Sequence, residues 1–399
     1  MPGKLEFTRI QRMVTRMGMK NWVVLGMVLL CAAVAPAQKR GKVDINTETP
    51  EGQALQAIGQ EADPVKKLAL LEEFLQKHPA HPGALWVLGQ AETAYAKAGQ
   101  HDKVLATVPK ILAADPADVE MAHQGLKSAE AKGDTALVVE WAQKTRESAQ
   151  AAEKLPKPAD EDELENWKHT VDFAQQVQKY CDYSLYAHAL KVADPAGKIQ
   201  AGEALAKANP QSEYVPQLNE TLFVAYRQAN QNDKAVALGE KLLSANKANE
   251  DILLVMLDHY ARAKDAAKVE KTAQAMVDMM KTKAPPQGVD PAAWEKKKTT
   301  VMGIGLHVLG VSYSNAGKAA QADKTLREAL PLLTEEQMKA EALFHLGLSN
   351  YKMGNGAKDG SKLILEAMRF NQQCAAIKSP WQAQATKNIA AIRTQYRMK

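Results

Sequence analysis

The stretch GLHVLGVSYSNAGKAAQADKTLREALPLL, residues 305–333, reads as two consecutive amphipathic helices. Three glycines interrupt it, although an interior glycine costs a helix roughly 1 kcal/mol relative to alanine. Gly317 follows the last periodic residue of the first helix, where a left-handed residue is favoured. Gly310 and Ala322 are both small, which indicates that backbone meets backbone between two closely packed antiparallel helices. The pattern gives no comparable reason for a glycine at position 305.

The same pattern returns along the chain at a fixed interval. Gly99 and Gly133 each separate two apolar helical runs and are 34 residues apart. Tyr226 and Tyr260 each end an apolar run and are also 34 residues apart. A fixed period in this range is typical of proteins in which each repeat is a helical pair that buries its apolar face against its neighbours. No sustained alternation of β-branched and polar residues predicts a strand, so the fold class is all-α.

Residues 306–326 match the spacing L-x2-L-G-x2-Y followed by A-x3-L. Residues 85–116 and 340–370 repeat parts of it, with the tyrosine of the latter displaced by one place to Tyr351. The chain therefore resembles the tetratricopeptide repeat (TPR) family over most of its length. That resemblance implies a right-handed α-solenoid of helical hairpins and a role in protein–protein interaction.

Proline-rich segments divide the predicted repeats into three groups. KLPKPAD at 154–160 and KAPPQGVDP at 283–291 are linkers or turns. The groups they separate are the N-terminal TPR-like repeats at 50–150, the central TPR-like repeats at 160–282, and the C-terminal TPR repeats at 290–399.

Two repeats, at 160–210 and 290–335, have a first helix extended toward its amino end. Trp167 precedes Tyr186 by 19 residues, and Trp294 precedes Tyr313 by the same number. Residues 380–399 read as a final helix that caps the stack, because the terminal repeats of a solenoid need a polar outer face.

The first 37 residues have the pattern of a signal peptide. A basic stretch precedes an apolar run of 14 residues, Trp22 to Ala35, which is shorter than the roughly 20 residues that a membrane-spanning helix needs. The small residues Ala35 and Ala37 fit cleavage after Ala37, and residues 38–49 are then a disordered mature N-terminus. We therefore expect an exported protein, periplasmic or secreted, with no transmembrane span in the mature chain.

Two alternatives concern this leader. The basic region is long, so translation could begin at Met17 or Met19 instead of Met1. Cys31 lies within the apolar run and allows an outer-membrane lipoprotein, although Leu30 stands where a small residue is usual before a lipidated cysteine.

Charge argues against a nucleic-acid partner. The formal net charge of +5 comes mostly from the first 37 residues, and the rest holds 46 basic and 45 acidic residues. Nucleic-acid-binding domains usually carry a basic patch or stripe, and the sequence contains neither.

No motif predicts a catalytic site, a metal site or a cofactor. His78 and His81 flank Pro79 in a turn and lack further ligands, so a metal-dependent enzyme is a minor alternative. Cys181 and His188 are seven residues apart, too far for a nucleophile–base pair, and are expected in the core. Cys181 and Cys374 are not expected to form a disulfide, because about five repeats separate them.

The expected function is that of a non-enzymatic scaffold in the bacterial cell envelope, which binds a peptide or protein partner in the concave groove of the solenoid. The alternative is a lipid-anchored structural subunit of an outer-membrane-associated complex, held through Cys31. The resemblance implies groove positions on the first helix of each repeat. These positions are Trp86, Thr93, Glu220, Arg227, Asp258, His307, Val311, Phe344, Leu348 and Tyr351.

Overall fold

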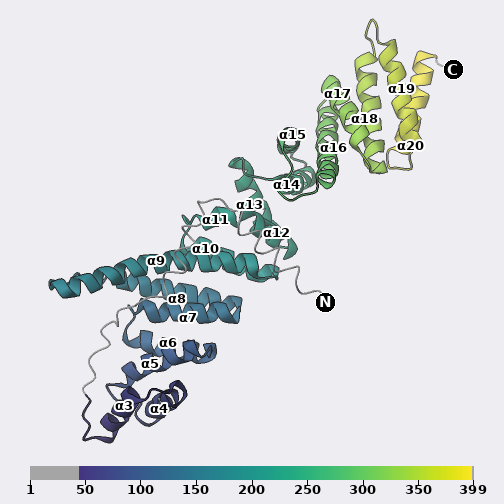
Figure 1. Cartoon of the computed structure of the whole chain (residues 1–399). Helices are drawn as coiled ribbons and strands as arrows, with labels where there is room; N and C mark the ends of the chain where they lie inside the picture. Colours follow the sequence, from purple (N-terminus) through teal and green to yellow (C-terminus); the bar gives the residue numbers. More distant parts are fainter. Residues whose placement is uncertain (1–44, 398–399) are drawn as a thin grey trace. The chain divides into compact units, whose positions relative to one another are not determined.

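The computed structural model describes residues 45–397, apart from the side chain of Asp162. The predicted signal peptide, Cys31, the alternative start sites and residues 38–44 lie outside the described residues. Within residues 45–397 every regular element is a helix, which confirms the all-α prediction (Figure 1). No helix in this range is both long enough and apolar enough to cross a membrane.

The chain divides into two compact units. The N-terminal unit contains the described residues up to Ala193 together with residues 200–215, and the C-terminal unit contains residues 194–199 and those from Pro216 onward. The helices of the N-terminal unit are α3 (Pro50–Gln60), α4 (Pro64–Lys77), α5 (Ala84–Lys97), α6 (His101–Ala114), α7 (Val119–Lys132), α8 (Thr135–Glu153) and α9 (Glu161–Lys191).

Two helices contribute residues to both units, namely α10 (Pro195–Ala208) and α11 (Tyr214–Gln217). The C-terminal unit contains α12 (Asn219–Gln228), α13 (Asn232–Ser244), α14 (Glu250–Arg262), α15 (Ala266–Thr282), α16 (Pro291–Asn315), α17 (Ala319–Ala329), the 3-10 turn η1 (Leu330–Leu332), α18 (Glu336–Gly354), α19 (Ser361–Ala375) and α20 (Gln382–Tyr396).

Within each unit the helices pack in the order in which they follow along the chain. From α3 to α9, and again from α12 to α20, each helix contacts the next one. Contacts to the next helix but one also occur, between α7 and α9 and between α16 and α18. Packing mainly between helices that follow one another along the chain is typical of a solenoid, so each unit is an α-solenoid of helix pairs.

The glycines of the repeat pattern have two separate roles. Gly317 has φ +76° and ends α16, and the amide of Lys318 donates to the carbonyl of Tyr313, as predicted for a left-handed cap. Gly310 has no room for a side chain, since a Cβ there would lie 2.5 Å from Cγ of Leu326. The close approach is therefore confirmed, but its nearest partner is the Leu326 side chain and not Ala322.

Gly305, which the sequence pattern did not explain, faces the preceding helix. A Cβ at this position would lie 2.9 Å from Cγ2 of Val277 and 3.0 Å from Cε of Met276, both on α15. Gly305 and Gly310 thus serve opposite sides of α16. One faces the previous helix pair and the other faces the partner within its own pair.

The two extended helices are present. α9 has 31 residues and α16 has 25, whereas α5, α6 and α7 have 14 each. Asp290 caps α16 by accepting from the amide of Ala293, and Pro291 occupies the first turn, as predicted. The predicted terminal helix is α20.

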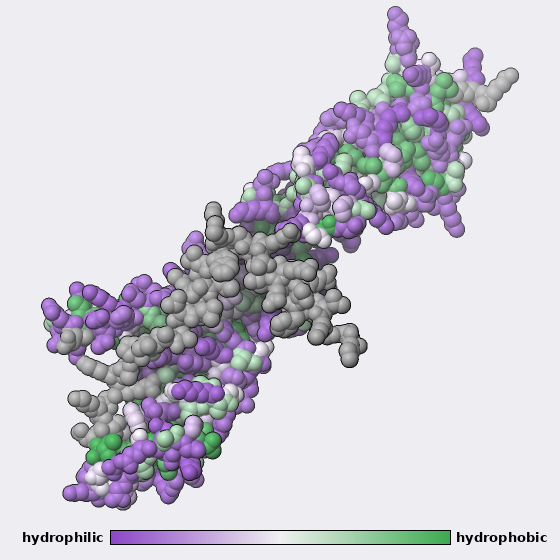
Figure 2. All heavy atoms as spheres, viewed as in Figure 1, coloured by the Kyte–Doolittle hydropathy of each residue, from purple (hydrophilic) through white to green (hydrophobic). Residues whose placement is uncertain are grey.

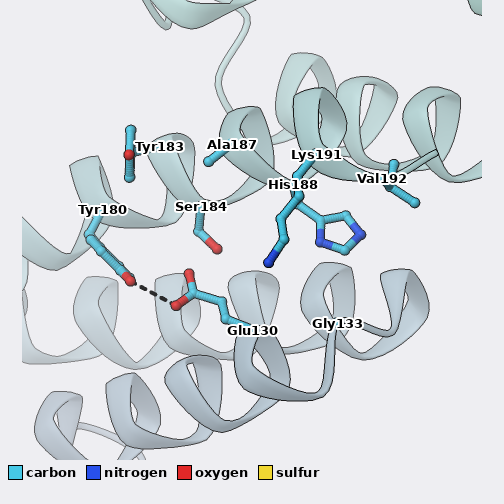
Figure 3. Close-up of a pocket in the computed structure, with 9 residues that line it drawn as sticks. All are labelled: Glu130, Gly133, Tyr180, Tyr183, Ser184, Ala187, His188, Lys191 and Val192. Carbon is cyan, nitrogen blue, oxygen red and sulfur yellow. Dashed lines mark hydrogen bonds between the residues drawn. The ribbon is translucent and has the colours of Figure 1, made fainter. Parts of the chain in front are cut away.

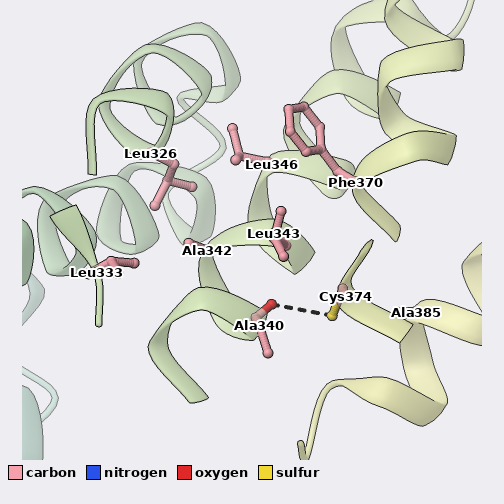
Figure 4. Close-up of a cluster of buried hydrophobic side chains, with 9 residues drawn as sticks. All are labelled: Leu326, Leu333, Ala340, Ala342, Leu343, Leu346, Phe370, Cys374 and Ala385. Atoms are coloured by element: carbon pink, nitrogen blue, oxygen red, sulfur yellow. Dashed lines mark hydrogen bonds between the residues drawn. The ribbon is translucent and has the colours of Figure 1, made fainter. Parts of the chain in front are cut away.

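The core of the last repeats joins α17, α18, α19 and α20 (Figure 4). Leu343 and Leu346 of α18 meet Phe370 and Cys374 of α19, and Ala385 of α20 closes the cluster. These side chains are all nearly inaccessible, which explains how a final helix with few apolar residues stays attached. In contrast, hydrophilic residues dominate the molecular face shown in Figure 2.

Candidate functional site

The predicted groove residues divide between the two units, and their exposure varies. Trp86 and Thr93 belong to the N-terminal unit, and the other eight belong to the C-terminal unit. Four are exposed, five are half-buried and one is buried. The exposed residues are Thr93, Glu220, Arg227 and Asp258. The half-buried residues are Trp86, Val311, Phe344, Leu348 and Tyr351. His307 is buried. Their role in binding stays a prediction.

Two of the aromatic groove residues are engaged by the terminal helix. The ring of Phe344 stacks on that of Trp381, which precedes α20, with centroids 4.9 Å apart. The hydroxyl of Tyr351 donates to Oε1 of Gln395 at 2.7 Å. Replacing either residue would therefore disturb the packing of α20 as well as any bound partner.

His307 is only 5% exposed and lies between α16 and α18. Its Nε2 is 3.4 Å from Oε2 of Glu341, and this close approach of His307 lowers the pKa of that carboxyl. On the same side of α18, Nδ1 of His345 lies 2.9 Å from Oγ of Ser314. Burial lowers the pKa of His345 to about 4, so the cluster holds a neutral His345 at neutral pH.

The N-terminal unit carries a row of aromatic side chains that the sequence pattern did not single out. Ring contacts run from His123 through Tyr180 to Tyr183, with centroids 4.9 and 6.3 Å apart. Tyr214 then touches both Tyr183 and Tyr186, and it stacks on Tyr186 at 4.8 Å. We call these five residues the aromatic row. Tyr183 is 38% exposed, so the row is accessible at its middle.

The buried side of α9 fixes the aromatic row in place. Asp182 is buried and forms an ion pair with Arg146 of α8. It also accepts a hydrogen bond of 2.7 Å from the side-chain amide of Asn209. The neighbouring Cys181 is fully buried and its thiol is free. Tyr180, Tyr183 and Tyr186 follow one another at intervals of three residues, so they lie along one side of α9, and the buried Cys181 and Asp182 lie on another.

A pocket of about 330 Å³ adjoins the aromatic row, between the carboxyl-terminal ends of α7 and α9 (Figure 3). Glu130 and Gly133 line it from α7 and the turn that follows. The remaining lining residues are Tyr180, Tyr183, Ser184, Ala187, His188, Lys191 and Val192. This volume lies at the lower end of the range for small-ligand sites, so the pocket is large enough for one side chain of a partner.

Polar groups in the pocket come from both helices. The hydroxyl of Tyr180 donates to Oε2 of Glu130 at 2.8 Å. Burial, and the charge of Glu130 next, raise the pKa of Tyr180, so this hydroxyl stays protonated. Nε2 of His188 lies 2.8 Å from Oγ1 of Thr135 on α8. Ser184 is 3% exposed, and its hydroxyl has no hydrogen-bond partner among the described residues.

The histidines and cysteines that the sequence analysis considered for chemistry are packed against neighbouring side chains or hydrogen-bonded to the backbone. His78 and His81 are half-buried and pack on Phe74, with ring centroids 5.2 and 5.5 Å from it. Nδ1 of His81 accepts from the amide of Gly83. Cys374 donates to the carbonyl of Ala340 and is also a free thiol.

Residues 45–397 hold no group of three or more histidine, cysteine, aspartate or glutamate side chains that could bind a metal ion.

The comparisons with known proteins give little beyond the fold. No family model and no curated protein matches the chain. Among solved structures it is similar to the TPR domain of P58(IPK), with 12% identity over 88% of this chain and 99% of that chain, and a TM-score of 0.25. It is also similar to yeast Tom70, with 9% identity over 88% of this chain and 90% of that chain, and a TM-score of 0.24.

TM-scores this low carry no argument about function or about the whole chain. The TPR-like character instead follows from the molecule itself. Each unit stacks antiparallel helix pairs in chain order, and the left-handed glycines Gly99 and Gly133 end α5 and α7 at the expected interval. A close-packed glycine, Gly310, meets the partner helix of its pair. The resemblance to the TPR family is thus confirmed at the level of the fold.

Proposed function

We propose that this protein is a non-enzymatic scaffold that binds a protein or peptide partner across the aromatic row of its N-terminal unit. The observation that carries the proposal is the concentration of tyrosine there. The chain has ten tyrosines, and four of them, Tyr180, Tyr183, Tyr186 and Tyr214, touch one another beside a pocket. Tyrosine is enriched at protein interfaces and at their energetic hot spots.

Two features support a protein partner over a small substrate. Tyr180, Tyr183 and Tyr186 lie along one helix and beside a pocket, an arrangement that suits an elongated segment of a partner. Asp182, the buried acid of α9 nearest to the row, is held by structural partners, Arg146 and Asn209. The groove positions predicted from the sequence form a separate, second part of the proposal.

The test is photo-crosslinking in the native cell. A benzophenone amino acid replaces Tyr183, and a matched variant carries it in place of Val65, a residue of α4 in the same unit that is 79% exposed. We expect discrete adducts from position 183 and none of the same mass from position 65. Adducts from Val65 alone, or identical adducts from both, would refute the aromatic row as the binding surface.

Substitution provides the second measurement. Replacing Tyr183 and Tyr186 by serine should abolish retention of the crosslinked partner and leave the thermal unfolding of the N-terminal unit nearly unchanged, because both rings are partly exposed. Phe344 and Tyr351 are poorer choices for such a test, since both are engaged by the terminal helix.

We further propose that the scaffold acts in a bacterial cell envelope, after export and cleavage beyond Ala37. The support is the basic and apolar pattern of the first 37 residues and the small residues at the cleavage site. Mass spectrometry of the mature protein tests this proposal. A chain beginning at Gln38 supports export as a periplasmic or secreted protein, a lipidated Cys31 supports the anchored alternative, and an uncleaved leader contradicts both.

A further inference from the structure

The pocket beside the aromatic row is assembled from groups that favour positive charge. It lies where α7 ends at Lys132, followed by the cap Gly133, and where α9 ends at Lys191. The carboxyl-terminal end of a helix carries partial negative charge, which stabilises cations within the last turn. Two such ends meet here, and the carboxylate of Glu130 adds a full negative charge.

One carboxylate oxygen of Glu130 and the hydroxyl of Ser184 are available to a ligand in this pocket. Tyr180 binds one oxygen of Glu130, Oε2, and no described side chain makes an ion pair with this carboxylate. The hydroxyl of Ser184, which is buried and unpartnered, points into the same space (Figure 3). A buried hydroxyl without a partner costs free energy, so a ligand that supplies a donor there gains affinity.

The walls of the pocket suit a flat cation. The rings of Tyr180 and Tyr183 form one side, with centroids 6.3 Å apart. Aromatic faces attract cations within about 6 Å, and arginine does so more often than lysine because its planar group also stacks. The guanidinium of arginine has five donors, enough to serve a carboxylate and a hydroxyl together.

One cationic side chain, Lys191, already lines the pocket. Its side chain reaches into this space toward Glu130 in Figure 3, yet the two residues form no ion pair within the described structure. Lys191 is exposed and is the last residue of α9, so its chain can turn outward to solvent without loss of packing. Lys191 can therefore give way to a ligand cation that binds the carboxylate of Glu130 more closely.

We propose that this pocket receives an arginine side chain of the bound protein partner, held by Glu130 and Ser184 and stacked on Tyr180 or Tyr183. The inference rests on the proposed function, because the arginine belongs to the partner. It specifies the chemistry that a recognised segment must carry, which the aromatic row by itself leaves open.

The test uses small probes, so that it reads the pocket without the partner. The purified protein is labelled with 3-fluorotyrosine, and the fluorine resonances of Tyr180 and Tyr183 are assigned from their phenylalanine variants. The probes are the N-acetyl methylamides of arginine, glutamine and glutamate, compared at equal ionic strength. We expect the arginine probe to shift these two resonances with a Kd at least about tenfold lower than that of the glutamine probe.

Variants separate the contributing groups. Glu130→Gln should bring the arginine probe to the level of the glutamine probe, whereas Glu140→Gln, an exposed acid of α8 paired with Lys144, should leave it unchanged. Lys191→Met should leave arginine binding intact or make it tighter, because a competing cation is removed. Thermal unfolding of each variant shows whether the fold is retained.

The inference is overturned if the arginine and glutamine probes bind equally, if the glutamate probe binds best, or if Glu130→Gln retains full arginine binding in a folded protein. Its failure is distinct from failure of the proposed function. Crosslinking at Tyr183 without arginine preference would reject only the pocket chemistry. Arginine binding without any partner adduct at Tyr183 would reject the proposed surface.

Discussion

The ammonium nitrogen of Lys103 lies 4.9 Å from the centre of the Tyr95 ring, and both side chains donate to the same carboxylate, that of Glu72, at 2.7 and 2.8 Å. The three residues come from α6, α5 and α4, so the contact joins three consecutive helices. The arrangement recurs in the C-terminal unit, where Tyr260 and Lys268 share Glu240 and the lysine again lies 4.9 Å from the ring centre. In both cases the lysine follows the tyrosine by eight residues.

This contact leads to a prediction about which member stabilises the repeat. Tyr95 is 7% exposed, so Tyr95→Ala should lower the free energy of unfolding of the N-terminal unit by about 3 kcal/mol through the lost packing. Lys103→Met should cost less than about 1 kcal/mol, because the lysine is half-exposed and solvent screens its charge. Urea denaturation followed by circular dichroism measures both values. A larger loss from Lys103→Met than from Tyr95→Ala would contradict the assignment.

The close approach at Gly310 predicts a strong effect of size. Gly310→Leu should destabilise the C-terminal unit by several kcal/mol, because even the first carbon of the new side chain would overlap with Leu326. The matched control is Gly59 of α3, where an added Cβ would meet no neighbouring group within 4 Å. Gly59→Ala should be neutral or stabilise by up to about 1 kcal/mol. Differential scanning calorimetry compares the two, and an unchanged Tm for Gly310→Leu would refute the helix pairing.

Glu250 is a buried charge that depends on its partners. It is 5% exposed, and it binds Lys283 and also Lys297 at 2.9 Å. Glu250→Gln leaves both lysines without this carboxylate and should lower the free energy of unfolding by about 2–4 kcal/mol. Its neighbour Asp251 also contacts Lys297, at 3.1 Å, but is well exposed, so Asp251→Asn should cost less than about 1 kcal/mol. Equal losses in the two variants, measured by denaturant unfolding, would show that burial of Glu250 is unimportant.

Acid should destabilise the fold in two stages. Burial lowers the pKa of both His123 and His345 from 6.5 to about 4. The unfolded chain therefore binds protons between these values that the folded chain excludes, and the free energy of unfolding falls as pH drops from about 6.5 to 4. Burial alone would raise the pKa of Glu250, but hydrogen bonds from Lys283 and Lys297 outweigh it and lower the pKa to about 2. The stability that Glu250 contributes above its unfolded pKa of 4.5 is then lost as pH falls toward 2.

The first stage can be isolated by substitution. His345→Gln should reduce the dependence of the free energy of unfolding on pH between 6.5 and 4, by about 2–3 kcal/mol across the interval. His169 is a suitable control because its side chain is 65% exposed. His169→Gln should change the free energy of unfolding by less than about 0.5 kcal/mol, as is usual for an exposed side chain. Urea denaturation at a series of pH values measures both, and an unaltered slope in His345→Gln would contradict a buried neutral imidazole.

The sequence by itself determined the helical repeat. Gly317 and Asp290 act within a few residues of their own positions, one as a left-handed cap and the other as an N-cap, so local chemistry was sufficient to predict them. The 34-residue period and the small residue at Gly310 likewise require only that neighbouring helices pack in chain order.

Only the tertiary structure decided the candidate site. Glu130 and Tyr180 are 50 residues apart, and their hydrogen bond exists because α7 and α9 contact each other across α8. Three tyrosines in the segment YCDYSLY, 180–186, were a local signal for the aromatic row, in a chain with only 6% aromatic residues. The orientation of these tyrosines depends on the contacts of the buried Asp182 with Arg146 and Asn209. Residue spacing alone does not predict these contacts. Helix identity is thus set by short-range periodicity, whereas side-chain accessibility is set by contacts between distant residues.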